Sequence, residues 1–205
     1  MESVIEPTEI DQVIGKKFLK KKSILGDKER ETLYIVEECT TEEFKGCQYL
    51  LLFFSAGWCP PCEQFLQVLK DFYSEVNIGG KIVEVLYISA DKKEQDFKET
   101  YAKMPWLTYQ YNNPMRTQLL EKYSITGVPI VYVCDASTGF VITYKGRKDI
   151  CELGVSCMKN WQDEMPDMQE KMKHLTEGAK IVEEARIAAE AEEKRKKEAA
   201  DRENE

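Results

Sequence analysis

Two cysteines three residues apart, Cys59 and Cys62, carry the most specific chemistry in the sequence. Residues with this spacing on a helix face the same way, with Cβ atoms about 5 to 6 Å apart, and a disulfide requires roughly 3.5 to 4.5 Å. A slight tightening of the helix would join the two sulfurs. At a helix N-terminus, unpaired backbone N–H groups and the helix dipole stabilise a thiolate, the nucleophilic form of cysteine. The spacing therefore predicts thiol–disulfide exchange, with Cys59 attacking a target disulfide and Cys62 releasing the reduced target.

Two other interpretations of the cysteine pair are a zinc half-site and a pair of structural thiols. A closed zinc site requires four ligands. The sequence contains no second Cys-x-x-Cys motif, and its single histidine, His174, lies in the polar C-terminal region. Redox chemistry is thus the favoured interpretation, and we expect no metal and no cofactor other than the redox-active disulfide Cys59–Cys62.

The residues around the pair predict a strand that leads into a helix. Residues 48–55 form a continuous apolar run, as in a strand buried on both faces, and Ala56 and Gly57 end it. Pro60 and Pro61 suit the first helical turn, where the backbone N–H has no intrahelical acceptor. The apolar residues that follow recur at helical spacing until residues 77–80; they are Phe65, Leu66, Leu69, Phe72, Tyr73 and Val76.

Further apolar and charged patterns predict the remaining elements. Residues 16–39 are typical of an N-terminal β-hairpin or meander, and residues 81–89, 130–134 and 140–144 of strands. Amphipathic patterns predict helices over residues 94–103 and 114–123. This order of elements predicts an α/β fold with a central mixed β-sheet flanked by helices on both faces.

Size and charge limit the classes of function. The chain has 205 residues and a formal net charge of −8, which argues against a nucleic-acid partner because binding to phosphates requires clustered Lys and Arg. The first residues lack the basic start and apolar stretch of a secretory signal, and the longest apolar run is too short to span a membrane. We therefore expect a cytoplasmic protein that keeps most of its seven cysteines as thiols. Cys134, in an apolar strand, is expected to be a small core residue.

The C-terminal part of the chain differs from the rest in composition. Residues 176–205 contain ten acidic and seven basic residues and no aromatic residue, with several Glu and Lys paired four apart. We predict a domain over residues 1–168 and a charged helical tail over residues 169–205. The tail is expected to be a solvated helix. The alternative is a redox-sensing binding or scaffold module that this helix docks into a larger assembly, such as a cilium.

The motif and three later landmarks resemble the tryparedoxin and nucleoredoxin branch of the thioredoxin superfamily, and most of all its nucleoredoxin-like proteins. Trp58-Cys59-Pro60-Pro61-Cys62 is the form that the motif takes in this branch. The sequences Ser-Ala-Asp at residues 89–91, Lys-Met-Pro-Trp-Leu at 103–107 and Gly-Val-Pro at 127–129 match its later landmarks in order. The resemblance covers roughly residues 46 to 168.

The resemblance implies a thioredoxin-like fold and a protein-disulfide reductase, with disulfide-containing protein substrates and an upstream thiol reductant. It also implies that the Val128–Pro129 peptide bond is cis and that the Val128 backbone pairs with an extended substrate segment beside the cysteines. Trp58, with Pro60 and Pro61, would contact substrate. Trp106 would lie at the rim of the site, or else pack as a core aromatic.

Two positions depart from the pattern of related proteins. Thioredoxins carry a buried Asp on the strand before the motif, where it handles the proton of the second cysteine, and here that position is Phe53. Glu84 is the only carboxylate within the strand predicted over residues 81–89, but it lies five residues before Ser89. At roughly 3.3 Å per residue this is about 16 Å from the C-terminal end of that strand, too far away for Glu84 to replace the missing Asp. Tryparedoxins commonly have Arg directly after the motif, whereas this chain has Glu63, whose charge is expected to oppose thiolate formation modestly.

Overall fold

The computed structural model of the chain describes residues 10–25 and 32–165. A compact unit ends at Trp161. The predicted domain boundary at residue 168 and the predicted tail over residues 169–205 lie outside the described residues, as does His174. No described helix combines the length and apolar character needed to cross a membrane.

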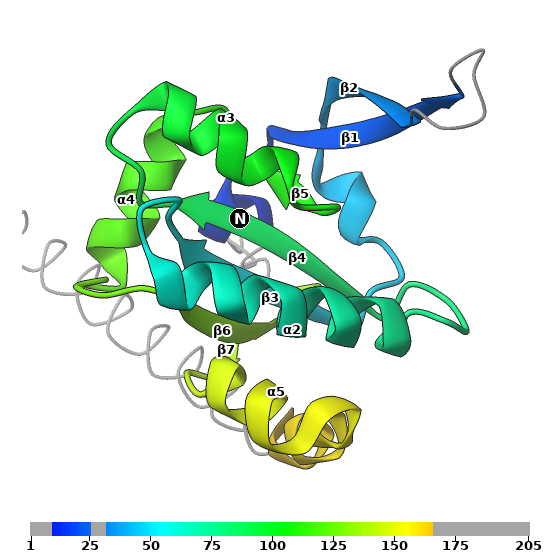
Figure 1. Cartoon of the computed structure of the whole chain (residues 1–205). Coiled ribbons are helices and arrows are strands. Elements are labelled where there is room, and N and C mark those ends of the chain that lie inside the picture. Colours follow the sequence, from blue (N-terminus) through cyan, green and yellow to red (C-terminus); the bar gives the residue numbers. More distant parts are fainter. Residues whose placement is uncertain (1–9, 26–31, 166–205) are drawn as a thin grey trace, which may run out of the picture. The chain divides into compact units, whose positions relative to one another are not determined.

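A seven-stranded mixed sheet forms the centre of the fold, with the strand order β2-β1-β5-β4-β3-β6-β7 (Figure 1). The strands are β1 (Phe18–Leu25), β2 (Thr32–Cys39), β3 (Tyr49–Ser55), β4 (Val83–Ser89), β5 (Leu107–Thr108), β6 (Ile130–Asp135) and β7 (Val141–Thr143). Strand β3 runs parallel to β4 and antiparallel to β6, and β1 and β2 form an antiparallel hairpin. The predicted mixed sheet and N-terminal hairpin are confirmed.

Helices cover both faces of this sheet. The labelled helices are α1 (Ile10–Ile14), η1 (Thr41–Phe44), α2 (Pro60–Val76), α3 (Glu94–Ala102), α4 (Pro114–Lys122), α5 (Gly146–Leu153) and η2 (Gly154–Ser156), and residues 157–165 are helical as well. The bounds of α3 and α4 agree with the predicted helices to within one residue. Strand β5, which has only two residues, was not predicted. A helix was expected after the last strand, but without bounds, because α5 begins in a charged segment with a single buried apolar side chain, Ile150.

The central strand β3 explains why the apolar run of residues 48–55 carries no alternation. Side chains along a strand point to opposite faces in turn, so a strand with helices on both sides is apolar throughout. Leu50, Leu52 and Phe54 belong to a core cluster that includes Ile14 of α1 and Leu119 of α4. The other face carries Tyr49, Leu51 and Phe53, and all seven residues of β3 are buried.

Aromatic rings fill the space between the second face of the sheet and α2. The ring of Phe53 meets those of Phe65 and Trp106 at centroid distances of 5.8 and 6.1 Å, and Trp161 meets Tyr49 and Phe72 at 5.5 and 5.8 Å. Edge-to-face arrangements of this kind are the preferred geometry of aromatic pairs. This packing fixes α2 on the sheet, and with it the position of the first turn of α2.

One lysine fastens the N-terminal hairpin to the rest of the fold. The Nζ of Lys21, on β1, donates to the carbonyl oxygens of Tyr101, Ala102 and Met104, each at 2.7 Å. These carbonyls lie at the C-terminal end of α3, where helical carbonyls lack intrahelical donors and the helix dipole favours a cation. The same ammonium lies 4.8 Å from the centroid of the Tyr101 ring. Lys21 therefore holds β1 against the end of α3.

Replacing Lys21 by Met should lower the free energy of unfolding by about 2 kcal/mol, because the apolar stem is retained but the charge-assisted hydrogen bonds to the carbonyls are lost. Equilibrium denaturation in urea measures the change. The matched control is Lys22→Met on the same strand, whose ammonium is mostly exposed and lies 3.8 Å from Glu37. Equal effects of the two substitutions would show that Lys21 is not an anchor.

Candidate active site

Cys59 and Cys62 lie at the N-terminus of α2, directly after the loop that leaves β3. Cys59 is the N-cap residue of the helix, with extended backbone angles, and its Sγ accepts a hydrogen bond from the Cys62 backbone N–H at 3.3 Å. Pro60 and Pro61 are the first two helical residues. Cys59 and Cys62 form a disulfide with a Cα–Cα distance of 5.2 Å, within the usual range. The predicted strand-to-helix turn is confirmed.

The surroundings of the disulfide are apolar and open on one side. Cys59 is 6% exposed and Cys62 only 2%, whereas the neighbouring Trp58 is 60% exposed. Pro60 and Pro61 are exposed as well. Cys59 is therefore the more accessible cysteine of the pair, with the exposed side chains of Trp58, Pro60 and Pro61 around it.

The loop before β6 reaches the disulfide from a distant part of the sequence. The Val128–Pro129 peptide bond is cis, as the resemblance implies. The Val128 carbonyl oxygen lies 3.4 Å from the Sγ of Cys59, and Pro129 is buried beside it. The half-buried Val128 thus places a backbone segment next to the more exposed sulfur.

Trp106 lies in the core rather than at the rim. It is 1% exposed, and its ring packs edge-on against those of Phe53 and Tyr73, at centroid distances of 6.1 and 5.7 Å. Its indole N–H has no hydrogen-bond partner among the described residues. Of the two alternatives left open for Trp106, a rim residue or a packed core aromatic, its burial agrees with the second. The ring fills the space between the sheet and α2, and in that position substrate cannot touch it.

A buried carboxylate, Asp91, supports the loop before Cys59 and was not predicted as a site residue. One carboxylate oxygen accepts the Gly57 backbone N–H at 2.8 Å, and the other accepts the hydroxyls of Tyr87 at 3.0 Å and Ser89 at 2.8 Å. Asp91 is 2% exposed. The parallel register pairs Ser55 with Ser89, so Gly57 and Asp91 each lie two residues beyond their strands. The sequence signal that could have predicted this role is the position of Asp91, an acidic residue directly after a strand of the parallel pair.

Two further contacts fix this arrangement. Arg116 of α4 donates from Nη1 to the Ser89 carbonyl at 2.8 Å and from Nε to the Tyr111 carbonyl at 2.9 Å, which holds the loop that carries Asp91. Gly57 must be glycine, because a Cβ there would collide with the Oγ1 of Thr100 on α3. The loop before the cysteines is therefore clamped between α3 and the end of β4.

The two sequence departures have clear structural consequences. Phe53 is buried among aromatic rings, so this position holds no proton acceptor. Glu63 forms an ion pair with Lys103 at 2.7 Å, and the hydrogen bond from Lys103 lowers the pKa of Glu63. Lys103 thereby offsets part of the opposition to a thiolate that was expected from Glu63.

A cavity of about 20 Å³, room for about one water, borders Cys62, and Glu63 and Lys103 also line it.

Glu84 lies near the start of β4, at the opposite end of this strand from Asp91, and its carboxylate is held by neighbouring groups. Its carboxylate pairs with Lys81, accepts the backbone N–H of Val85 at 2.7 Å and lies 3.3 Å from the hydroxyl of Tyr73. Burial raises the pKa of Glu84. The prediction that Glu84 is too remote to serve the cysteines agrees with this position.

The other five cysteines are free thiols. Burial raises the pKa of Cys134 and of Cys157 to about 12, and that of Cys39 to about 11. Cys134 is a core residue, as predicted, and Cys151 is exposed. Among the residues that the structure describes, no three His, Cys, Asp or Glu side chains are grouped so as to hold a metal ion.

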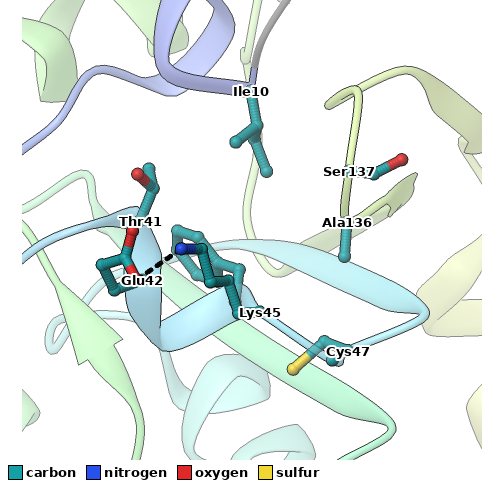
Figure 2. A pocket seen from close by; sticks show the side chains of 9 residues that line it. Ile10, Thr41, Glu42, Lys45, Cys47, Ala136 and Ser137 are labelled. Atoms are coloured by element: carbon teal, nitrogen blue, oxygen red, sulfur yellow. Dashed lines mark ion pairs between the residues drawn. The ribbon is translucent and has the colours of Figure 1, made fainter.

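A separate pocket of about 510 Å³ contains Cys47 (Figure 2). Its walls come from η1, the loop that enters β3 and the turn after β6, with the ion pair between Glu42 and Lys45 on one side. Cys59 follows the other end of β3, and a strand of seven residues spans about 23 Å. Burial raises the pKa of Cys47. The pocket is therefore remote from the disulfide.

Replacing Asp91 by Ala should lower the free energy of unfolding by roughly 3 kcal/mol, because two buried hydroxyls and the partly buried Gly57 backbone N–H lose their acceptor. Asp91→Asn should cost less, since an amide oxygen still accepts. Hydrogen exchange at the Gly57 amide should be faster in both variants. Asp71→Ala, at an exposed carboxylate that pairs with Gln67, is the control. Unchanged exchange at Gly57 in Asp91→Ala would contradict the supporting role.

In the reduced, folded protein, alkylation at pH 8 should modify Cys151 and Cys59 but leave Cys134 and Cys157 unmodified. A raised pKa keeps the latter two as thiols, and their thiolate fraction rises about tenfold per pH unit until the pH reaches about 12. Mass spectrometry of peptides after timed alkylation gives the order. Modification of Cys134 as fast as that of Cys151 would be inconsistent with its burial.

Comparisons with known proteins agree with this geometry. The thioredoxin-like family model matches residues 46–141. Mouse nucleoredoxin is 38% identical over 100 residues, 48% of this chain but only 23% of the relative. Tryparedoxin of Trypanosoma brucei brucei is 36% identical over 104 residues, 50% of this chain and 72% of the relative. A solved tryparedoxin from Trypanosoma brucei superposes with a TM-score of 0.56 and 32% identity, over 61% of this chain and 86% of that chain.

These likenesses include the parts of the molecule that form the site. The matched family region contains the cysteine motif, Asp91 and the cis Pro129. The chain spans about a quarter of the length of the nucleoredoxins and most of the length of the tryparedoxin. The chain belongs to the tryparedoxin and nucleoredoxin branch of the thioredoxin superfamily, a family of thiol–disulfide oxidoreductases.

Proposed function

We propose that this chain is a protein-disulfide reductase that cycles between the Cys59/Cys62 dithiol and the Cys59–Cys62 disulfide. The observation that carries the proposal is the position of this disulfide. It lies at a helix N-terminus, one sulfur beside the Val128 carbonyl and next to an exposed tryptophan. Such a position favours the thiolate, restricts attack to one sulfur and provides a backbone segment for an extended substrate.

The proposed cycle conserves electrons and sulfur bonds. The Cys59 thiolate attacks one sulfur of the substrate disulfide, a mixed disulfide forms, and the other substrate sulfur leaves as a thiolate. The Cys62 thiolate then attacks the Sγ of Cys59, which releases the second substrate thiolate and closes Cys59–Cys62. Two electrons have passed to the substrate. An upstream thiol reductant returns two electrons to the enzyme by the same exchange in reverse.

Each surface residue of the site has a proposed role in binding substrate. The Val128 backbone pairs with an extended segment of the substrate beside Cys59, as in strand addition. Trp58 covers the substrate from the other side with its exposed ring, and Pro60 and Pro61 keep the first turn of α2 rigid and apolar. Protein disulfides in exposed, extended segments are thus the proposed substrates.

The free thiols support a proposed cytoplasmic location. Cys151 is an exposed free thiol, and such thiols persist in reducing compartments. The alternative of a scaffold module docked into a cilium or another assembly has no support in the comparisons, and the helix that it depends on lies outside the described residues. The reductase is therefore the function that we propose.

In an insulin-reduction assay with dithiothreitol as the reductant, turnover above the uncatalysed rate should be lost in Cys59→Ser, because the variant lacks the thiol that attacks the substrate disulfide. Cys62→Ser should give a stable mixed disulfide between Cys59 and the insulin chain, visible by mass spectrometry without reducing agent. Cys151→Ser, which removes an exposed thiol elsewhere, is the control and should behave like the unmodified protein. Undiminished turnover in Cys59→Ser would contradict the proposed function.

A further inference from the structure

A groove of about 400 Å³ runs along one side of α2, between this helix and the segment that joins α3 to β5. We call it the lysine groove; its lining residues are Lys21, Lys70, Ser74, Ala102, Lys103, Met104 and Pro105. Three of these residues are lysines, and none of the described lining residues is acidic. The groove is therefore a cationic surface, although the chain as a whole has a net charge of −8.

The lysine groove begins next to the active site. Lys103 and Met104 line both the groove and the small cavity that borders Cys62. Along α2, Glu63, Lys70 and Ser74 are spaced by seven and four residues, which places them on one face of the helix. At about 1.5 Å per residue, Ser74 is about 16 Å from Glu63 along the helix axis. An extended peptide of about five residues would cover this length.

The positions of Lys21 and Lys70 create the positive charge of the groove. The ammonium of Lys21 is fixed by its hydrogen bonds to three backbone carbonyls and cannot turn away without losing them. Burial and the like charge of Lys70 lower the pKa of Lys21 to about 8. The two cations therefore repel each other across a recess that is partly screened from water. An anion beside Lys70 would relieve this repulsion, and in a partly screened recess its attraction would exceed that on an open surface.

Lys103 is oriented at the end of the groove nearest the cysteines. Its ammonium lies 2.7 Å from Glu63, so one carboxylate already occupies this end. This ion pair shows that a carboxylate from a neighbouring element can meet Lys103 at hydrogen-bond distance. The part of the groove that extends toward Lys70 and Ser74 has no such carboxylate among its described lining residues.

We propose that the lysine groove binds Asp and Glu side chains of the protein substrate, so that disulfides flanked by acidic residues are reduced in preference to others. This proposal rests on the proposed reductase function and adds a substrate class to it. The substrate disulfide would meet Cys59 while the acidic residues a few positions away lie along α2 toward Lys70.

Two synthetic peptides of the same length provide the test, each with one intramolecular disulfide and differing only in having Glu or Gln at the flanking positions. The unmodified protein should reduce the Glu peptide with a kcat/KM higher by about threefold or more, as expected for one or two partly exposed ion pairs. Lys70→Gln should bring the ratio close to one, and Lys70→Glu should invert it. Both variants should reduce the Gln peptide as the unmodified protein does.

The control variant is Lys148→Gln, which makes the same change in charge on α5, away from the lysine groove. It should keep the full preference. Sodium chloride at 1 M should abolish the preference, because the screening length falls to about 3 Å. Equal kcat/KM values for the two peptides, or a preference that persists in Lys70→Gln and Lys70→Glu, would overturn the proposal. Failure to reduce either peptide would instead contradict the reductase function.

Discussion

The parallel pairing of β3 with β4 is the constraint on which the active site depends. Its register sets Ser55 opposite Ser89, so the chain leaves both strands at the same edge of the sheet. Only for that reason can the Asp91 carboxylate reach the Gly57 N–H and hold the loop that presents Cys59. A shift of this register by one residue would send every side chain of β3 to the opposite face and separate Gly57 from its acceptor.

Beneath the cysteines, this chain has aromatic rings where thioredoxins have a carboxylate. Phe53, Phe65 and Trp106 pack together under α2 and hold it rigidly on the sheet. The floor of the site is thus apolar, and charged groups near Cys62 lie at its side, where Glu63 and Lys103 line a small cavity. Among the described residues, the aromatic floor of the site therefore offers no base for the Cys62 proton.

The buried cysteines differ in the groups that surround the sulfur. In Cys134 and Cys157 the apolar surroundings raise the pKa to about 12, so these thiols are inert fillers of the core. Cys59 differs because it caps a helix and its sulfur accepts a backbone N–H. The same residue type thus serves packing or chemistry according to whether backbone dipoles or hydrocarbon surround the sulfur.

The sequence by itself determined the strand-to-helix turn, the cysteine pair and the mixed sheet, because these depend on local spacing and apolar periodicity. The resemblance added the cis bond before Pro129. Only the tertiary structure decided that Trp106 is buried, that Asp91 supports Gly57 and that Lys103 pairs with Glu63, since each contact joins segments at least 30 residues apart. Local pattern shows which side chains are apolar or charged. Which of them meet depends on strand register and on how the helices pack across the sheet.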